Sequence, residues 1–193
     1  MQHIIKSEFI AITSCIEQLR NWSEELEKIV QICVESLQAK GKIIFCGNGG
    51  SAAQAQHLAA ELVGRYKLER RALSALSLTV DTSNITAIGN DYGYTDIFRR
   101  QLEGLGRKGD VLIGLSTSGN SSNVVLAFEL AREMGITTIA LTGELGGKMK
   151  ELSDICITVP SRETNHIQEM HIIIGHILCG LIENRFITSG DDQ

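Results

Sequence analysis

The chain reads Lys42-Ile43-Ile44-Phe45-Cys46 and then Gly47-Asn48-Gly49-Gly50-Ser51-Ala52-Ala53, a short apolar run followed by a glycine-rich turn and small residues. An apolar run of this length that ends in glycine is typical of a buried strand in a parallel sheet. The small residues favour a helix, with Ser51 as its expected N-cap. Backbone N–H groups converge where such a turn enters a helix and can bind an anion. We therefore expect an α/β fold with a ligand-binding turn at this point.

The same alternation of short apolar runs and helical stretches continues along the chain. Strands are predicted at 42–46, 75–79, 110–115, 137–141 and 155–159, and helices at 51–65, 83–88, 94–105, 121–134 and about 168–186. This order predicts a doubly wound, five-stranded parallel sheet. Before Gly41, apolar residues recur at steps of three and four, which predicts two helices. We expect one domain over 1–193, with a helical arm (1–40), an α/β core (41–187) and a polar tail (188–193).

Composition excludes several classes of protein. Among 193 residues, 18 Lys and Arg face 23 Asp and Glu, so the net charge is -5 and no basic nucleic-acid surface is expected. The longest apolar run, 172–182, is shorter than the roughly 20 residues of a membrane span. The first residues lack the features of a signal peptide, which predicts a cytoplasmic protein. The five cysteines are odd in number and widely spaced, as expected of reduced core thiols.

A second loop carries hydroxyl groups at the predicted end of the third strand. It reads Ser116-Thr117-Ser118-Gly119-Asn120-Ser121 and precedes a predicted helix. Hydroxyls and amides at a helix start can hold a phosphate monoester, although one serine would suffice to cap the helix. No Gly-Lys-Ser or Gly-Lys-Thr motif is present, so ATP chemistry is not expected. The loop at 47–52 matches a dinucleotide fingerprint only loosely.

Several polar residues could hold a metal or move protons. His57 and Glu61 lie four residues apart and project from one face of a predicted helix. Such a pair is also common as a solvated ion pair. The last predicted helix adds Gln168, Glu169, His171 and His176. His176 lies within the apolar run and could equally be a core residue.

Together these motifs resemble those of the phosphoheptose isomerases, a family of the sugar isomerase (SIS) domain superfamily. The matching residues are Gly47 to Ala53, Gln56-His57, Ala60-Glu61, Gly64-Arg65, Gly89-Asn90-Asp91-Tyr92-Gly93, Ser116 to Ser121 and Ile167-Gln168-Glu169-Met170-His171. The resemblance covers nearly the whole chain. It implies the SIS fold and the interconversion of sedoheptulose 7-phosphate and D-glycero-D-manno-heptose 7-phosphate, the first step in making heptose precursors for lipopolysaccharide or other surface glycans.

The resemblance also implies a role for each matching residue and a cytoplasmic homotetramer with active sites at subunit contacts. Glu61 and His176 would be the acid/base pair, and zinc would be bound by His57, Glu61, Gln168 and His176. Phosphate would be held by Ser51, Ser116, Thr117, Ser118 and Ser121. The sugar would contact Asn48, Gly49, Gly50, Asn90 and Asp91, with Glu61 and Gln168 also facing the substrate. An aldose–ketose isomerisation needs a base, an acid and charge stabilisation for an enediolate, which these groups can supply.

Three features qualify that assignment. Gln168 and His176 are eight residues apart, about 12 Å on a straight helix, which is too far for one shared ion. Either they come from different subunits or Gln168 precedes the helix. Some family members have Asp-Arg where this chain has Asn165-His166. A role as metal ligand would also lower the basicity of Glu61.

Two alternatives remain open at this stage. One alternative is a non-catalytic SIS protein that binds sugar phosphates or the bacterial replication initiator. The relatives that bind the initiator lack the acid/base residues at the positions of Glu61 and His176, and both are present here. Another sugar-phosphate isomerase, acting for example on arabinose 5-phosphate, is less consistent with a short chain that carries no regulatory domain.

Overall fold

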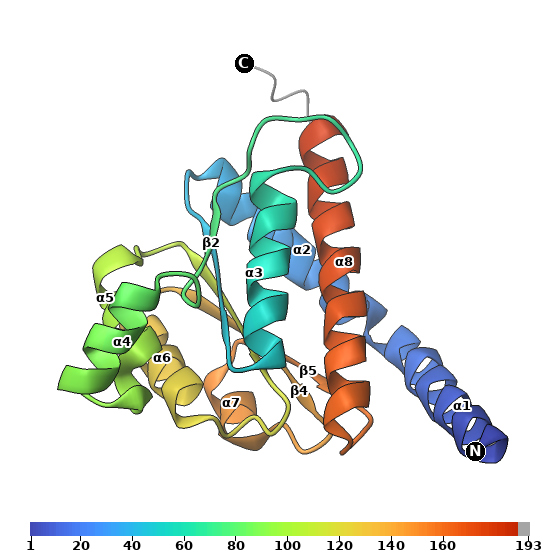
Figure 1. The fold of residues 1–193 in the computed structure, drawn as a ribbon. Helices are drawn as coiled ribbons and strands as arrows, with labels where there is room; N and C mark the ends of the chain where they lie inside the picture. The colour runs from blue at the N-terminus through green and yellow to red at the C-terminus, as the bar shows by residue number, and fades with distance from the viewer. Residues whose placement is uncertain (189–193) are drawn as a thin grey trace.

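The computed structural model describes residues 1–188, which form one parallel sheet covered by helices (Figure 1). The strands are β1 (Ile43–Gly47), β2 (Ala75–Ser77), β3 (Val111–Ser116), β4 (Thr137–Gly143) and β5 (Ile155–Val159). The helices are α1 (Gln2–Leu19), α2 (Ser23–Gln38), α3 (Gly50–Val63), α4 (Thr82–Asp91), α5 (Ile97–Leu105), α6 (Ser122–Glu133), α7 (Gly147–Leu152) and α8 (Thr164–Thr188). Short 3-10 turns cover Arg20–Trp22 and Tyr94–Asp96.

The sheet has the order β2-β1-β3-β4-β5 with all neighbours parallel. Alternate residues of β1 face opposite layers. Ile43 and Phe45 pack with α2, α3 and α8, whereas Ile44 and Cys46 pack with α5, α6 and α7. Since side chains along a strand alternate between faces, both faces of the sheet are apolar and both are covered. The predicted doubly wound, five-stranded parallel sheet is confirmed.

The fold brings two loops together at one edge of the sheet. β1 and β3 are neighbours, with Gly47 in register with Leu115. The chain leaves β1 for α3 on one face of the sheet and leaves β3 for α6 on the other. Parallel sheets of this kind open a crevice where the connections diverge, and ligands bind there. The glycine turn after β1 and the hydroxyl-rich loop after β3 lie side by side at this place, where Asn48 Nδ2 donates to Asn123 Oδ1.

Some predicted boundaries were wrong. Helix α3 begins at Gly50, so Ser51 lies inside its first turn and is not the N-cap. Gly49 precedes the helix with φ 57°, a left-handed conformation that glycine adopts readily, and this turn starts the helix one residue early. The predicted helix 94–105 is a 3-10 turn followed by α5, and the six-residue α7 was not predicted.

The amino-terminal arm consists of two helices with different surroundings. Figure 1 shows α1 projecting away from the body. Phe9 and Ile10 on α1 are 66% and 70% exposed. Helix α2 instead buries Ile29 and Cys33 in the core. In a single chain, α1 therefore exposes an apolar surface to solvent.

Helix α8 lies beside α3 (Figure 1) and packs with it on one face of the sheet. Residues 164–187 are long and apolar enough to cross a membrane by composition, but half of that stretch is buried within the protein. Core helices of soluble proteins have the same composition, so nothing here indicates a membrane protein. Of the tail expected at 188–193, Thr188 ends α8 and the remainder lies outside the described residues.

The cysteines are free thiols, as predicted. Four of the five are buried, and Cys156 is half-buried. Burial raises the pKa of Cys33, Cys46 and Cys179 to about 12. These thiols are therefore protonated core residues.

Candidate active site

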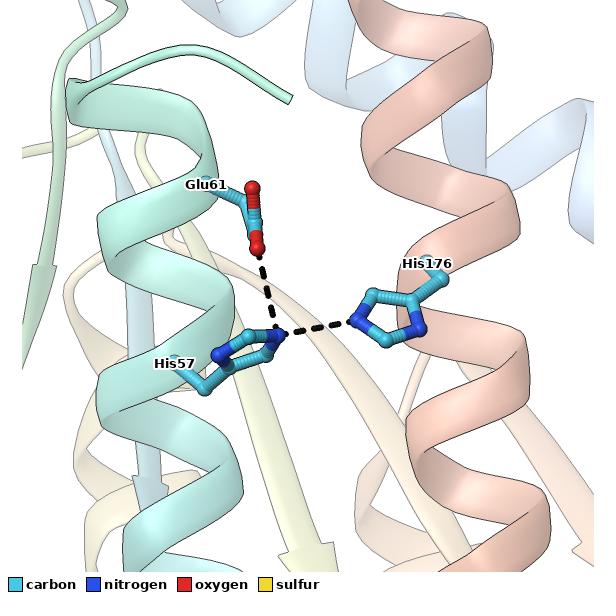
Figure 2. Close-up of side chains that lie close together, drawn as sticks. All are labelled: His57, Glu61 and His176. Atoms are coloured by element: carbon cyan, nitrogen blue, oxygen red, sulfur yellow. Dashed lines mark hydrogen bonds and ion pairs between the residues drawn. The ribbon is translucent and has the colours of Figure 1, made fainter. Parts of the chain in front are cut away.

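Three titratable side chains from two helices converge on one point (Figure 2). His57 and Glu61 come from α3 and His176 comes from α8. The Nε2 atoms of the two histidines lie 2.9 Å apart, and His57 Nε2 lies 3.2 Å from Glu61 Oε1. One ligand atom from each residue falls within 4.8 Å of the other two. The imidazole rings meet edge to face, with centroids 5.1 Å apart.

Close packing of α3 against α8 creates this cluster. His57 and Glu61 share a face of α3 because they are one helical turn apart. Gly175, the neighbour of His176, has no side chain between the helices. A Cβ atom there would lie 2.5 Å from Leu58 Cδ2. The glycine therefore lets α8 approach α3 closely enough for the two imidazoles to meet.

The cluster has the composition of a zinc site. Two imidazole nitrogens and a carboxylate oxygen are ligand atoms that zinc accepts. Ligands about 2.1 Å from a tetrahedral ion lie roughly 3.4 Å from one another. Two of the three separations in the cluster, 2.9 Å and 3.2 Å, are close to that value, and all three ligand atoms lie within 4.8 Å of one another. His57, Glu61 and His176 therefore fit the metal.

The loop after β3 presents hydroxyl groups and backbone amides at the start of α6. Ser116 Oγ and Ser121 Oγ lie 3.0 Å apart, and Ser118 Oγ accepts a hydrogen bond from the Asn120 N–H. Gly119 has φ 65°, and a Cβ there would lie 1.9 Å from the Gly146 carbonyl oxygen. Only glycine fits this turn. Thr117 is half-buried beside these serines.

The glycine turn lies beside that loop, and hydrogen bonds hold its Asn48 side chain in place. Asn48 and Asn123 exchange two amide hydrogen bonds of 2.8 Å, and the Tyr94 hydroxyl donates to Asn48 Oδ1 at 3.0 Å. Ser51 is buried in the first turn of α3. Sequence reasoning missed Asn123 and Tyr94. Asn123 could have been noticed as an amide two residues after the serine-rich loop, whereas nothing local marks Tyr94.

Gln168 lies apart from the histidine cluster. Its side-chain amide lies against the glycine turn, where a Cβ on Gly50 would come within 2.8 Å of it. Helix α8 begins at Thr164, so Gln168 is within the helix and the idea that it precedes the helix is wrong. Two turns of α8 separate it from His176.

The remaining polar candidates lie in different surroundings. Asn90 and Asp91 are exposed at the end of α4, where Asn90 Nδ2 donates to Asp91 Oδ1. His171 is fully buried, and its Nε2 lies 3.3 Å from the Thr142 carbonyl oxygen. Desolvation lowers the pKa of His171 to about 4. His166 Nε2 lies 2.9 Å from Glu8 Oε2, joining α8 to α1.

Known proteins with this architecture have related sequences. Residues 9–143 match the family model described as the SIS domain. The phosphoheptose isomerase of Akkermansia muciniphila is 59% identical over 183 residues, covering 95% of this chain and 97% of that protein. The phosphoheptose isomerase of Helicobacter pylori Shi470 is 57% identical, covering 95% of this chain and 96% of that protein. The solved phosphoheptose isomerase of Neisseria gonorrhoeae has a TM-score of 0.89 at 42% identity, covering 95% of this chain and 98% of that one. With similarity over almost the full length of both sequence and structure, the chain belongs to the SIS domain family and, within it, to the phosphoheptose isomerases.

Proposed function

We propose that this phosphoheptose isomerase interconverts sedoheptulose 7-phosphate and D-glycero-D-manno-heptose 7-phosphate through an enediol. The observation that carries the proposal is the convergence of His57, Glu61 and His176 on one point. Non-catalytic SIS proteins would need no such centre. The reaction would be the first step towards heptose precursors for lipopolysaccharide or other surface glycans.

Glu61 and His176 are the proposed acid/base pair. One of them takes the proton from the carbon beside the carbonyl, and the other protonates the carbonyl oxygen to give the neutral enediol. Returning the proton to the neighbouring carbon, with loss of the other hydroxyl proton, completes the exchange of aldose and ketose. Glu61 is half-buried and lies 3.2 Å from His57, which limits how its carboxylate can turn. Zinc bound by the cluster would polarise the carbonyl as a Lewis acid.

The crevice between β1 and β3 is the proposed place for the phosphate. Ser116, Ser118 and Ser121 supply hydroxyls beside the start of α6, and Thr117 adds another. Ser51 lies in the first turn of α3. Hydroxyls, backbone N–H groups and the positive ends of two helix dipoles favour a phosphate dianion without a basic side chain. Asn48, Gly49 and Gly50 line the same crevice, where the sugar would lie, with Asn90 and Asp91 as further proposed contacts.

A second copy of the chain is proposed to complete the active site. Gln168 and His176 are about 12 Å apart along α8, so a zinc ion held by both takes Gln168 from another subunit. Exposed Phe9 and Ile10 on α1 offer an apolar surface for that contact. A groove of about 500 Å³ between α2 and α8, lined by Leu26 and Ile177 among others, is a further apolar surface. We propose that the assembly is a homotetramer. We also propose that it is cytoplasmic, because free thiols are typical of a reducing compartment.

The deciding experiment measures conversion of sedoheptulose 7-phosphate by the purified protein, with His176→Gln as a control. Arabinose 5-phosphate serves as the competing substrate. Turnover of the heptulose that is lost in His176→Gln supports the proposal. Preference for arabinose 5-phosphate would assign another isomerase activity. Binding of sugar phosphate by an intact tetramer without any turnover would favour a non-catalytic SIS protein.

A further inference from the structure

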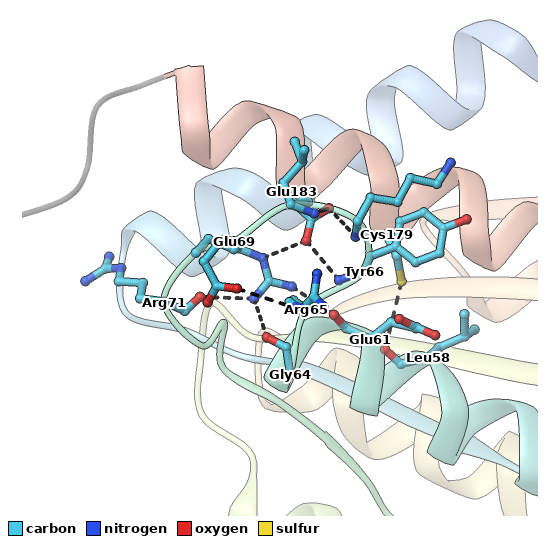
Figure 3. Close-up of polar contacts among 12 residues, drawn as sticks. Leu58, Glu61, Gly64, Arg65, Tyr66, Glu69, Arg71, Cys179 and Glu183 are labelled. Carbon is cyan, nitrogen blue, oxygen red and sulfur yellow. Dashed lines mark hydrogen bonds and ion pairs between the residues drawn. The ribbon is translucent and has the colours of Figure 1, made fainter.

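The loop between α3 and β2 is fastened to α8 by one buried carboxylate. Glu183 on α8 has a side chain only 1% exposed. The N–H of Tyr66 donates to Glu183 Oε1 at 2.9 Å, and those of Lys67 and Leu68 donate to Oε2 at 2.8 and 3.0 Å. Figure 3 shows Glu183 pointing from α8 into this loop. Three successive backbone amides thus depend on one side chain.

Arg70 balances the charge of that carboxylate. Its Nε lies 3.2 Å from Glu183 Oε1, and its side chain is 4% exposed. The guanidinium also donates to the carbonyl oxygens of Glu61 and Gly64 at the end of α3, at 2.8 and 3.0 Å. We call Glu183, Arg70 and the amides of 66–68 the loop clamp. Burial raises the pKa of Glu183, but the three N–H groups and Arg70 lower it by more, which keeps the carboxylate ionised.

The loop clamp sets the position of Tyr66, whose ring lies against His176. The two rings are stacked, with centroids 5.6 Å apart and planes 22° from parallel. Gly180 leaves room for the phenol, since a Cβ there would lie 3.2 Å from Tyr66 Cε1. His176, Gly180 and Glu183 follow one another at steps of four and three residues, so they share one face of α8. The clamp and the imidazole are therefore parts of one surface.

We propose that Glu183 is a positioning residue for the proposed isomerase reaction, acting through the loop clamp and Tyr66 on His176. The imidazole has His57 at its edge and Tyr66 on its face. Rotation about the terminal torsion of a histidine is soft, so packing on both sides decides its angle. Tyr66 holds the His176 ring with Nε2 directed at His57 and keeps water from that face of the ring. The inference rests on the proposed function for its catalytic part only.

The test compares four variants of the full-length protein. Glu183→Gln keeps the shape of the side chain but removes its charge and replaces one acceptor by a donor that faces backbone N–H groups. Tyr66→Ala removes the ring, and Tyr66→Phe keeps it. Glu69→Gln is the matched control, because Glu69 lies in the same loop and its side chain is 89% exposed.

Three measurements are made on each variant. The ring-current shift of the His176 imidazole protons, assigned by comparison with His176→Gln, reports whether Tyr66 stacks on it. Hydrogen exchange of the peptide covering 64–71 reports the state of the loop. Steady-state kinetics give kcat and KM separately. A change in kcat reports misplacement of a reacting group, because a shift of about 1 Å can lower the rate roughly 100-fold.

We expect Glu183→Gln and Tyr66→Ala to lose the shift and to lower kcat about 10- to 100-fold at similar KM. Exchange in 64–71 becomes faster in Glu183→Gln. Tyr66→Phe restores the shift and most of kcat relative to Tyr66→Ala, and Glu69→Gln matches the wild type. An unchanged shift or wild-type kcat in Glu183→Gln overturns the proposal.

Two further outcomes are also decisive. If Glu183→Gln does not fold, the comparison of Tyr66→Ala with Tyr66→Phe decides, and equal kcat in those two variants overturns the proposal. If the wild type shows no isomerase activity, the proposed function fails separately. The imidazole shift then still tests the positioning, and its persistence in Tyr66→Ala would contradict it.

Discussion

The Nε2 atoms of His57 and His176 lie 2.9 Å apart, although 119 residues separate the two histidines in the chain. At this separation one imidazole can donate its N–H to the other, or both nitrogens can offer lone pairs to one cation. Glu61 Oε1, 3.2 Å from His57 Nε2, adds negative charge to the same point. Packing of α3 on α8 thus brings together three groups that could bind one cation.

Zinc binding should depend on that centre. We expect the protein, once stripped with a chelator, to bind one zinc ion per chain. His57→Ala should weaken zinc affinity at least about 10-fold, because losing a group that only hydrogen-bonds to a metal ligand already costs about 10- to 100-fold in affinity. Titration against a zinc indicator measures the affinity. His3→Ala, an exposed histidine on α1, is the control. Equal affinity in His57→Ala and the wild type would remove the cluster as the zinc site.

Substitution of Glu61 should abolish turnover without unfolding the protein. Glu61→Gln removes the proposed acid/base group and should lower kcat about 100- to 10,000-fold, the range for loss of general acid–base catalysis. Circular dichroism checks the fold, and Glu69→Gln is a control with the same chemical change in an exposed loop. Turnover retained in Glu61→Gln would exclude the carboxylate from the reaction.

Serines of the loop after β3 should matter for binding more than for the chemical step. Ser118→Ala or Ser121→Ala removes a donor to a charged phosphate, worth about 1.5 to 3 kcal/mol, so KM should rise by roughly 10-fold or more. Initial-rate kinetics with the 7-phosphate substrate measure the change. Ser83→Ala, exposed on α4, should leave KM unchanged. Wild-type KM in both loop variants would argue against phosphate binding there.

Acidification should destabilise the fold through His171. Its pKa is lowered to about 4 by burial, below the ordinary value near 6.5 that applies in the unfolded chain. Between these values the unfolded state binds the extra proton, so the free energy of unfolding falls as pH drops from about 6.5 to about 4, by at most roughly 1.4 kcal/mol per pH unit.

Urea denaturation at fixed protein concentration across this pH range tests that dependence. His171→Leu should lose this part of the slope, even though its stability at pH 7 also changes. His3→Gln removes a solvent-exposed histidine and should keep the slope. A slope that persists in His171→Leu would mean that other groups cause it.

The exposed face of α1 should be covered in the assembled protein. Phe9 and Ile10 are 66% and 70% exposed in one chain. Replacing both by Asp places charges in the proposed contact and should shift the tetramer to a smaller species, because unpaired buried charges are costly. Light scattering coupled to size exclusion measures the mass. A monomeric wild-type protein would contradict the proposed assembly.

The strands and the two loops proposed to bind the substrate could be predicted from sequence because their signals are local. The run at 42–46 and its counterparts are short, apolar and end in Gly, Ser, Asp or Thr, which is enough to place a parallel strand. The hydroxyls of 116–121 follow such a run directly. Exact ends were less accurate: α7 is only six residues long and begins beside glycines at 146 and 147 with positive φ, so no helical period develops in it.

The amino-acid sequence by itself determined the layered α/β fold, the place of the hydroxyl-rich loop and the set of residue types that could carry isomerase chemistry. Tertiary structure alone decided which of those residues meet. His57 joins His176 because Gly175 lets two distant helices approach, and Gln168 stays beside Gly50 because one helix carries it two turns away from His176. Glu183 and Tyr66 carry no local signal at all. Their roles arise from contacts between segments 110 or more positions apart, which no pattern of neighbouring residues encodes.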